Sequence, residues 1–246
     1  LIVDDIGLYV DPTRPSKLET LIAARAQMPA HAQLRIEHLI ADLNASKLSK
    51  YNVGAGCPPL PEGHKILVAG QVEDDASIKL GAGDINTNHA LLMAARAANP
   101  NAIIVFKPHP DVEAGLRRGK VKNVSDLADV IAQDADPIAL IDACDAVWTM
   151  TSLIGFEALI RDTPVTCTGA PFYAGWGLTT DIGNTPARRG ARPTVLGLAH
   201  ADTGAAISVE MAVDMLVKSP NGRSKLALGA LVKLRQFRAK FLGLDQ

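Results

Sequence analysis

Apolar residues come in short runs from residue 64 onward, and these runs alternate with longer stretches of helical spacing. Four runs are apolar enough to be buried strands, at residues 65–70, 102–106, 146–149 and 164–168. Helices are expected between them, over residues 88–99, 125–131, 137–143 and 153–161. This alternation predicts a Rossmann-like parallel sheet with crossover helices.

The chain before residue 64 has a different pattern. Residues 1–10 are expected to form a strand, and Ser16 is expected to cap the helix that follows it. A second helix is expected after the break at Met28-Pro29. Residues 52–63 are rich in glycine and proline, so they are the best linker in the chain and the predicted domain boundary.

Residues 218–246, at the end of the chain, are strongly basic. Two closing helices are expected over residues 205–217 and 224–241. No acidic residue lies between Asp214 and Asp245, whereas lysine and arginine recur throughout residues 218–246. A basic amphipathic helix of this kind is typical of a membrane-surface contact, and the alternative is a helix whose apolar face closes the domain.

Composition narrows the class of protein. The 246 residues are 48% hydrophobic and carry a formal net charge of −1, which gives no overall attraction to nucleic acid. Three cysteines without metal-ligand spacing predict neither a disulfide framework nor a metal site, and fit a reducing compartment. No signal peptide and no apolar run near the roughly 20 residues of a membrane span is present.

An apolar strand at residues 102–106 runs directly into Lys107-Pro108-His109-Pro110. In an open parallel sheet, ligands bind beyond the carboxyl ends of the strands, where Lys107 and His109 would emerge. The two prolines stiffen the segment, and the two side chains offer a point charge and a directional N–H. The pair suits a phosphate or a carboxylate; the alternative is a proline-rich loop with incidental polar residues.

Two more segments are expected at the same edge. Residues 71–77 hold three carboxylates after the first strand, suited to a nucleophile, a general base or a hydroxyl acceptor; the alternative is a solvated acidic turn. At the strand-to-helix junction of residues 149–157, free backbone N–H groups and the Ser152 hydroxyl predict an anion site, with Gly155 allowing close approach. Glu157 is placed to accept hydrogen bonds from ribose hydroxyls, or is simply a helix former.

Residues 171–177 hold Phe172, Tyr173 and Trp176 between glycines. Such a loop forms either the wall of a ligand pocket, with Tyr173 and Trp176 facing it, or a plug over the core. No Walker loop, G-x-G-x-x-G, G-x-S-x-G or H-E-x-x-H motif occurs, so P-loop hydrolysis, dehydrogenation, serine hydrolysis and zincin chemistry lose support.

Five segments together resemble the capsular polysaccharide β-Kdo glycosyltransferases of Gram-negative bacteria. They are residues 11–16, 71–77, 107–113, 151–159 and 171–177, in the same order along the chain. The resemblance implies an α/β, GT-B-like fold: residues 1–60 would be the end of a truncated acceptor-side Rossmann-like domain with its linker, residues 61–217 the nucleotide-sugar-binding Rossmann-like domain, and residues 218–246 a basic helix. The rest of the first domain is expected upstream of Leu1.

The resemblance also implies a chemistry. Asp75 looks like the catalytic carboxylate, acting as a nucleophile, and His109 looks like the ligand of the phosphate of CMP-Kdo, the donor. Lys107, Ser152 and Glu157 are added to the nucleotide site from geometry and from similarity to other nucleotide-sugar transferases. Retention at the anomeric carbon needs two inversions, which a carboxylate nucleophile provides. No metal and no permanently bound cofactor are expected.

The implied acceptor is a Kdo-bearing phospholipid at the cytoplasmic face of the inner membrane, where the protein would be cytoplasmic or peripheral, alongside other capsule assembly proteins. Two alternatives stay open. One is a nucleotide-sugar epimerase of the same fold, which would bind UDP rather than CMP. The other is a truncated module that binds a nucleotide or a partner protein and does no chemistry.

Overall fold

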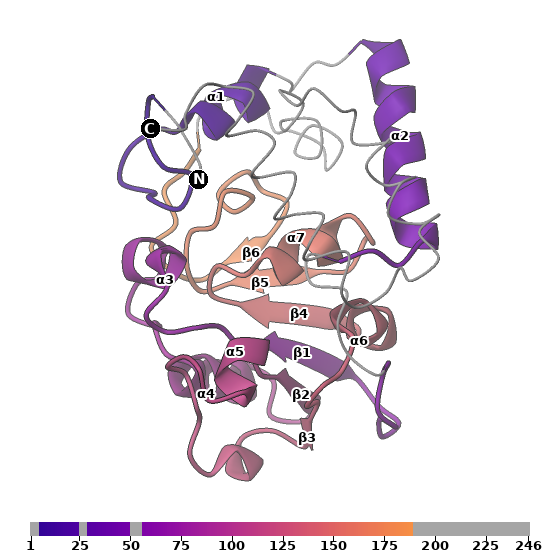
Figure 1. The fold of residues 1–246 in the computed structure, drawn as a ribbon, viewed down its shortest axis with the longest axis vertical. Helices are drawn as coiled ribbons and strands as arrows, with labels where there is room; N and C mark the ends of the chain where they lie inside the picture. The colour runs from indigo at the N-terminus through magenta and orange to yellow at the C-terminus, as the bar shows by residue number, and fades with distance from the viewer. Residues whose placement is uncertain (1–4, 25–28, 50–55, 189–246) are drawn as a thin grey trace.

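The computed structural model describes residues 5–24, 29–49 and 56–188 (Figure 1). Its centre is a six-stranded, all-parallel sheet in the order β3-β2-β1-β4-β5-β6. The strands are β1 (Lys65–Ala69), β2 (Ile103–Lys107), β3 (Val130–Ile131), β4 (Ala146–Thr149), β5 (Val165–Cys167) and β6 (Thr180–Asp181). This order is that of a Rossmann-type sheet, with its topological switch point between β1 and β4.

The register brings the carboxyl ends of the central strands level with one another. Ala69, the last residue of β1, pairs with Lys107, the last residue of β2. On the other side of β1, Val68 pairs with Trp148, which is followed by the final residue of β4. The segments that leave β1, β2 and β4 therefore emerge together at the switch point, where ligands bind in such sheets.

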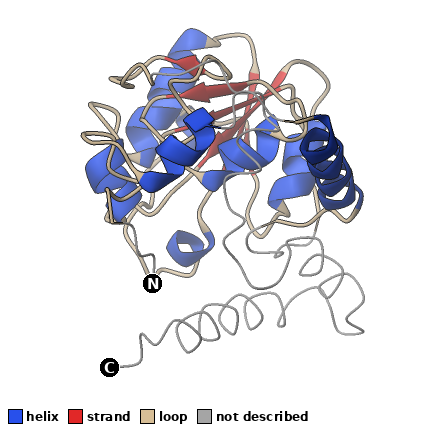
Figure 2. Cartoon of the chain, turned by 90° about the horizontal axis from the view of Figure 1, so that it is seen from above, coloured by secondary structure: helices blue, strands red, loops and turns tan. Residues whose placement is uncertain are grey.

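Helices cover both faces of the sheet (Figure 2). The described helices around the sheet are α3 (Ala76–Gly81), α4 (Asn88–Ala98), α5 (Pro110–Glu113), α6 (Pro137–Ala143) and α7 (Leu153–Leu159), with a 3₁₀ turn at Val124–Asp126. Ile66 and Val68 of β1 belong to a core with Leu91 and Leu92 of α4. Leu67, between them, belongs to the core of α6 and α7. Alternate side chains of a strand point to opposite faces of the sheet. A strand that is apolar at every position is therefore buried only if helices cover both faces.

Two further helices, α1 (Lys17–Ala24) and α2 (Ala30–Ala45), lie at the top of Figure 1 beyond β6 and α7. Ser16 begins α1 as predicted, because its Oγ accepts a hydrogen bond from the Glu19 N–H at 3.2 Å. Ile22 of α1 is fully buried in the same core as α6 and α7. Asn44 of α2 donates from Nδ2 to the Ile160 carbonyl at 2.9 Å, which fastens α2 to the end of α7.

Most of the predicted elements are confirmed, and two are wrong. Residues 5–10 form bends and turns rather than a strand; residues 1–4 lie outside the described part. The helix expected over residues 125–131 is a 3₁₀ turn followed by β3, because Val130 pairs with Val105 of β2 and the Ala132 N–H donates to the Phe106 carbonyl at 2.8 Å. Pairing with a neighbouring strand overrides local helical spacing here.

Three short elements were not predicted at all: α3, α5 and β6. The two closing helices and the basic segment of residues 218–246 lie outside the described residues. Within residues 5–24, 29–49 and 56–188, no helix is both long and apolar enough to cross a membrane.

Candidate functional site

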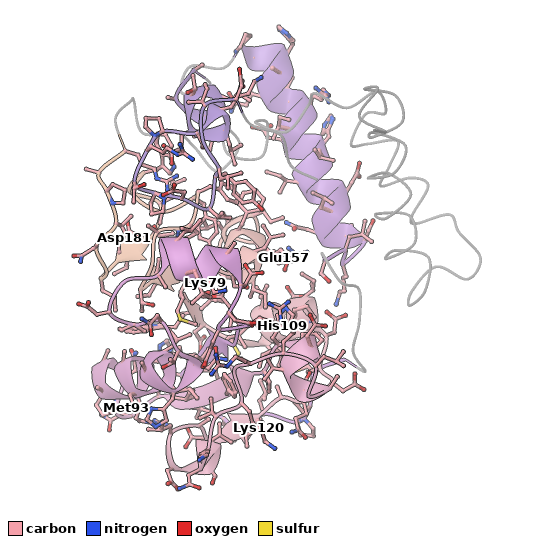
Figure 3. All side chains as sticks on the ribbon, turned by 60° about the vertical axis from the view of Figure 1, so that its left-hand side comes forward. Lys79, Met93, His109, Lys120, Glu157 and Asp181 are labelled. Carbon is pink, nitrogen blue, oxygen red and sulfur yellow. The ribbon has the colours of Figure 1, made fainter. Side chains whose placement is uncertain are left out.

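A cavity of about 490 Å³ lies at the carboxyl edge of β1, β2 and β4. Six of the seven predicted site residues line it, namely Asp75, Lys107, His109, Ser152, Glu157 and Tyr173. Figure 3 labels two of them, His109 from the segment after β2 and Glu157 from α7. Trp176 is not among the lining residues. Residues that are up to about a hundred positions apart in the sequence therefore line one cavity in the folded chain.

Asp75 is the N-cap of α3 and is exposed at the cavity. Its Oδ1 accepts from the Ser77 N–H at 2.9 Å and from the Ser77 hydroxyl at 2.8 Å. Aspartate is a favoured N-cap because its carboxylate satisfies N–H groups that the helix leaves unpaired. The cap that starts α3 therefore also orients a carboxylate toward the cavity.

His109 is the N-cap of α5, followed by Pro110 in the first helical position. Its Nδ1 accepts a hydrogen bond from the Asp111 N–H at 3.1 Å. A neutral imidazole that accepts at Nδ1 carries its proton at Nε2. The backbone thus favours the neutral tautomer in which His109 donates through Nε2, a form that can donate to an anionic ligand.

Lys107 ends β2, and its side chain is only 5% exposed. Its ammonium donates to the Pro108 carbonyl at 3.0 Å and to Glu113 Oε2 at 3.1 Å. Glu113 in turn accepts from the Asp134 N–H at 3.0 Å. Lys107 lines the cavity as predicted, but its charge is compensated by Glu113 and it fastens α5 and the loop after β3 to the sheet.

At the junction between β4 and α7, backbone N–H groups that the sequence leaves for an anion form hydrogen bonds within the protein. The Thr151 N–H donates to Gln71 Oε1 at 2.9 Å, and the Ser152 N–H donates to Thr149 Oγ1 at 3.0 Å. The Ile154 N–H donates to Ser152 Oγ at 3.2 Å, so the Ser152 hydroxyl serves as the N-cap of α7. Three N–H groups expected to bind an anion already have protein partners.

Gly155 has a different role from the one predicted. A Cβ at this position would lie 2.9 Å from Cζ and 3.1 Å from Cε2 of Tyr173. Tyr173 is fully buried, and its hydroxyl donates to the Ser152 carbonyl. Burial raises the pKa of this phenol well above its usual value, so the hydroxyl keeps its proton and remains a donor. The glycine makes room for the tyrosine ring rather than for an anion.

The aromatic loop of residues 171–177 mainly plugs the core. Trp176 is 5% exposed, belongs to the core of α6 and α7, and donates from Nε1 to the Phe172 carbonyl at 2.8 Å. It does not line the cavity, so its predicted place in the pocket wall is wrong. The aromatic wall consists of Tyr173 and its neighbour Phe172, whose rings pack edge to face at 5.2 Å.

Glu157 is 7% exposed, on α7, at the edge of the cavity. Arg161, one turn later, donates from Nη1 to the Glu157 carbonyl at 2.9 Å. Burial lowers the pKa of this guanidinium, and the nearby Glu157 carboxylate acts in the opposite direction. The structure thus places a buried carboxylate at the cavity, where the sequence expected a partner for ribose hydroxyls.

Gln71 and Arg117 are two of the polar lining residues that were not predicted as site residues. Gln71 is buried and bridges β1 to the β4–α7 junction, since its Nε2 also donates to Thr151 Oγ1 at 2.9 Å. Arg117, in the loop after α5, lies against Asp74, with Nη2 at 3.1 Å and Nε at 3.3 Å from Asp74 Oδ1. Gln71 could have been predicted from its place in the sequence, because it is the second residue after a buried strand. No feature of the sequence around Arg117 indicates that it lines the cavity.

Within the described part of the chain, no group of three or more histidine, cysteine or acidic side chains is placed to hold a metal ion. The acidic and basic lining residues are instead spread around the cavity. Asp75, Asp111 and Glu157 line the same cavity as Lys107, His109 and Arg117, so local placement rather than net charge decides where an anion binds.

Comparison with known proteins places this geometry in context. A model of the family described as "Capsule polysaccharide biosynthesis protein" matches residues 58–210. The lipopolysaccharide-processing protein LpsZ of Rhizobium meliloti is 40% identical over 241 residues, and the match covers 90% of this chain and 54% of LpsZ. The capsule polysaccharide modification protein LipA of Neisseria meningitidis serogroup B is 39% identical over 238 residues, covering 90% of this chain and 33% of LipA.

Two solved structures from Thermosulfurimonas dismutans share the fold. KpsC described as a beta Kdo 2,4 transferase superimposes with a TM-score of 0.77 at 32% identity, covering 88% of this chain and 72% of that one. KpsC described as a beta Kdo 2,7 transferase superimposes with a TM-score of 0.64 at 40% identity. This match covers 80% of this chain and 61% of that one. The α/β fold with its parallel sheet is therefore GT-B-like. The chain spans about half the length of LpsZ and a third of that of LipA.

Proposed function

Because the chain belongs to the capsule polysaccharide biosynthesis protein family, we propose that it is the nucleotide-sugar half of a retaining Kdo transferase that uses CMP-Kdo. One observation carries the proposal. A single cavity at the switch point of the sheet holds an oriented carboxylate, Asp75, and an oriented imidazole donor, His109. The similarity to the two KpsC transferases supports the sugar and the reaction class.

Asp75 is the proposed nucleophile. A carboxylate oxygen attacks the anomeric carbon of Kdo, the bond from that carbon to the CMP phosphate breaks, and a glycosyl-enzyme ester forms. An acceptor hydroxyl then attacks the same carbon from the vacated side, loses its proton to a base, and the carboxylate leaves. Two inversions retain the configuration, as in retaining glycosidases that use a carboxylate nucleophile.

His109 is the proposed partner of the leaving phosphate. Because its Nδ1 accepts from the Asp111 N–H, its Nε2–H is the donor for a phosphate oxygen. A hydrogen bond to the phosphate of the departing CMP strengthens as negative charge collects there, which lowers the barrier of the first step. Ser152 and Glu157, which line the same cavity, are proposed to contact the nucleoside portion of CMP, while Lys107 supports the site through Glu113.

The remaining parts of the proposal concern the acceptor. A Kdo-bearing phospholipid at the cytoplasmic face of the inner membrane would place the protein at that surface, beside other capsule assembly proteins. Acceptor contacts and the base for the second step are assigned to residues outside the cavity lining. The support for this part is the resemblance to capsule transferases and the basic composition of residues 218–246.

Two substitutions test the roles of the cavity residues. Asp75→Asn keeps an oxygen that can cap α3 and removes the nucleophile, so Kdo transfer in the full-length protein should fall by roughly three orders of magnitude or more with little change in CMP affinity. His109→Asn keeps an acceptor for the Asp111 N–H and removes the Nε2 donor. It should weaken CMP binding by roughly 1.5–3 kcal/mol, the range for a hydrogen bond to a charged group.

Calorimetry with CMP and with UDP, and a transfer assay with CMP-Kdo and a Kdo-terminated acceptor, measure both effects. Asp126→Asn and His89→Ala are matched controls, because both residues are exposed and neither lines the cavity. Tighter binding of UDP than of CMP would favour the epimerase. CMP binding without any transfer would favour the non-catalytic module, and near wild-type transfer by Asp75→Asn would refute the nucleophile.

A further inference from the structure

We propose that Arg117 binds the carboxylate of the donor's sugar, and this inference rests on the proposed function. Kdo is a 2-ulosonic acid, so its carboxylate is bonded directly to the anomeric carbon that the nucleophile attacks. Any cation that binds this carboxylate must therefore lie beside the nucleophile. Arg117 lines the same cavity as Asp75 and is held by Asp74, the residue that precedes Asp75 in the chain.

The position of Arg117 is fixed by contacts on both sides of it. The Arg117 N–H donates to the Asp111 carbonyl at 3.1 Å, and the carbonyl of the next residue, Arg118, accepts from the Glu73 N–H at 3.0 Å. The Gly119 carbonyl then accepts from Nδ2 of buried Asn88 at 2.8 Å. The loop after α5 is thus fastened to the loop after β1, so the backbone of Arg117 is held near Asp75.

The guanidinium itself is oriented by Asp74. Both contacts are to Oδ1 and use Nε and Nη2, so the Nη1 amino group is not engaged by Asp74. Arginine offers five N–H donors in a planar fork, and its Nη1 and Nη2 groups form a second edge that suits a carboxylate. The Arg117 and Asp74 side chains are 40% and 36% exposed. An ion pair this exposed adds little to stability, and it leaves the guanidinium accessible to a ligand.

The other cations of the cavity are less suited to this role. Lys107, His109 and Arg117 are the basic residues in the described lining. Lys107 is nearly buried and already paired with Glu113, whereas His109 presents a single N–H, suited to one phosphate oxygen. Arg117 also offsets the repulsion between the Asp75 carboxylate and the sugar carboxylate as they approach. The donor's two anionic groups thus bind to different residues, the phosphate to His109 and the carboxylate to Arg117.

The test compares a ligand that has only the phosphate with one that has both anionic groups. CMP and CMP-Kdo are titrated into the full-length protein, with Asp75→Asn present throughout to prevent turnover. Arg117→Gln should weaken CMP-Kdo binding at least about tenfold, the effect of losing a hydrogen bond to a charged group, and should leave the CMP affinity within about twofold. The matched control is the adjacent Arg118→Gln, which does not line this cavity and should change neither affinity.

The outcomes separate this inference from the proposed function. If Arg117→Gln leaves CMP-Kdo binding unchanged, or weakens CMP and CMP-Kdo equally, then Arg117 is not the carboxylate ligand, although the transferase proposal stands. If the protein with native Arg117 does not bind CMP-Kdo, both fall. Arg117→Lys provides a second readout in the Asp75 protein: a point charge replaces the fork, so the KM for CMP-Kdo should rise less than in Arg117→Gln.

Discussion

The cavity has two walls that use polar residues in opposite ways. On one wall, Gln71, Thr151, Ser152 and Tyr173 hydrogen-bond to one another or to the adjoining backbone and are buried or half-buried. We call these four residues the supporting wall. On the other, Asp75, His109 and Arg117 form the reactive wall, and each is held by an acidic, hydroxyl or backbone group nearby. Most of the groups that hold the sheet together are thus distinct from those that would meet the sugar and the phosphate of the donor, and Ser152 belongs to both sets.

The two walls also differ in the reach of their contacts. Gln71 and Thr151 of the supporting wall are 80 positions apart, whereas Asp75 of the reactive wall and Ser77 are two apart, as are His109 and Asp111. Two contacts depart from this contrast: Arg117 is 43 positions from Asp74, and Ser152 is two from Ile154. Long-range bonds between buried groups form only when the whole sheet folds, and losing one leaves a buried partner unsatisfied. We therefore expect substitutions on the supporting wall to reduce stability and those on the reactive wall to reduce activity.

Gln71→Leu should have the largest effect on stability. It is similar in size, but it leaves the Thr151 N–H and both threonine hydroxyls of the junction without their glutamine partners. Unsatisfied buried groups cost roughly 1–3 kcal/mol each, so we expect a loss of about 3 kcal/mol in the free energy of unfolding. Urea denaturation followed by circular dichroism measures it. Exposed Gln133→Leu is the matched control and should change stability by under about 0.5 kcal/mol.

If Asp75→Asn lowers the free energy of unfolding as much as Gln71→Leu does, then the two walls do not differ in their contribution to stability. Both can be compared in one series of urea titrations. A Gln71→Leu protein that unfolds like the wild type would mean that the hydrogen bonds of Gln71 are dispensable for folding.

Gly155→Ala should have a smaller effect, through packing rather than hydrogen bonding. The added methyl group would lie 2.9 Å from Cζ of the buried Tyr173 ring, so either the ring or α7 must shift. Overpacking of this kind costs about 1–3 kcal/mol. Gly83→Ala is the control, because a Cβ there meets nothing within 4 Å. Thermal unfolding should show a lower Tm for Gly155→Ala alone, and equal values for the two variants would rule out the tight contact.

The sequence predicted the parts of the fold that depend on runs of apolar residues. The four apolar runs became β1, β2, β4 and β5, and the parallel order followed from the helices between them. The elements that were predicted wrongly or missed include short strands that exist only because they pair with a neighbouring strand. Val130 and Ile131 have helical spacing but pair with β2, and β6 is a strand only because Thr180 pairs with Thr166 of β5. No local pattern encodes such pairing.

The site divides in the same way. The rule that ligands bind beyond the carboxyl ends of parallel strands was enough to bring Asp75 and His109 to one edge. It could not show that Lys107 pairs with Glu113, that Gly155 makes room for Tyr173, or that Trp176 turns into the core. The contact between Arg117 and Asp74 spans 43 positions, so it became visible only in the folded chain.

The three cysteines give the mildest test, because labelling them leaves the wild-type sequence intact. Cys57 is exposed, whereas Cys144 and Cys167 are buried. Burial raises the pKa of the Cys144 thiol to about 12 and raises that of Cys167, which lies beneath the supporting wall near Tyr173. The thiolate is the reactive form of cysteine. Both thiols should therefore react slowly with a labelling reagent, because burial blocks the reagent and also keeps the thiols protonated.

At pH 8 the folded protein should therefore take up one equivalent of a maleimide in a fast phase, and the other two only after unfolding. Burial also raises the pKa of Cys57, so this fast phase should accelerate as the pH rises from 7 to 9 and the thiolate fraction grows. Cys57→Ser should abolish it. In Gly155→Ala, loosened packing around Tyr173 should expose Cys167 sooner, identified by peptide mass. Fast labelling of Cys167 in the wild-type protein would instead mean that the supporting wall opens in the native state, against the division drawn here between a buried wall and a reactive one.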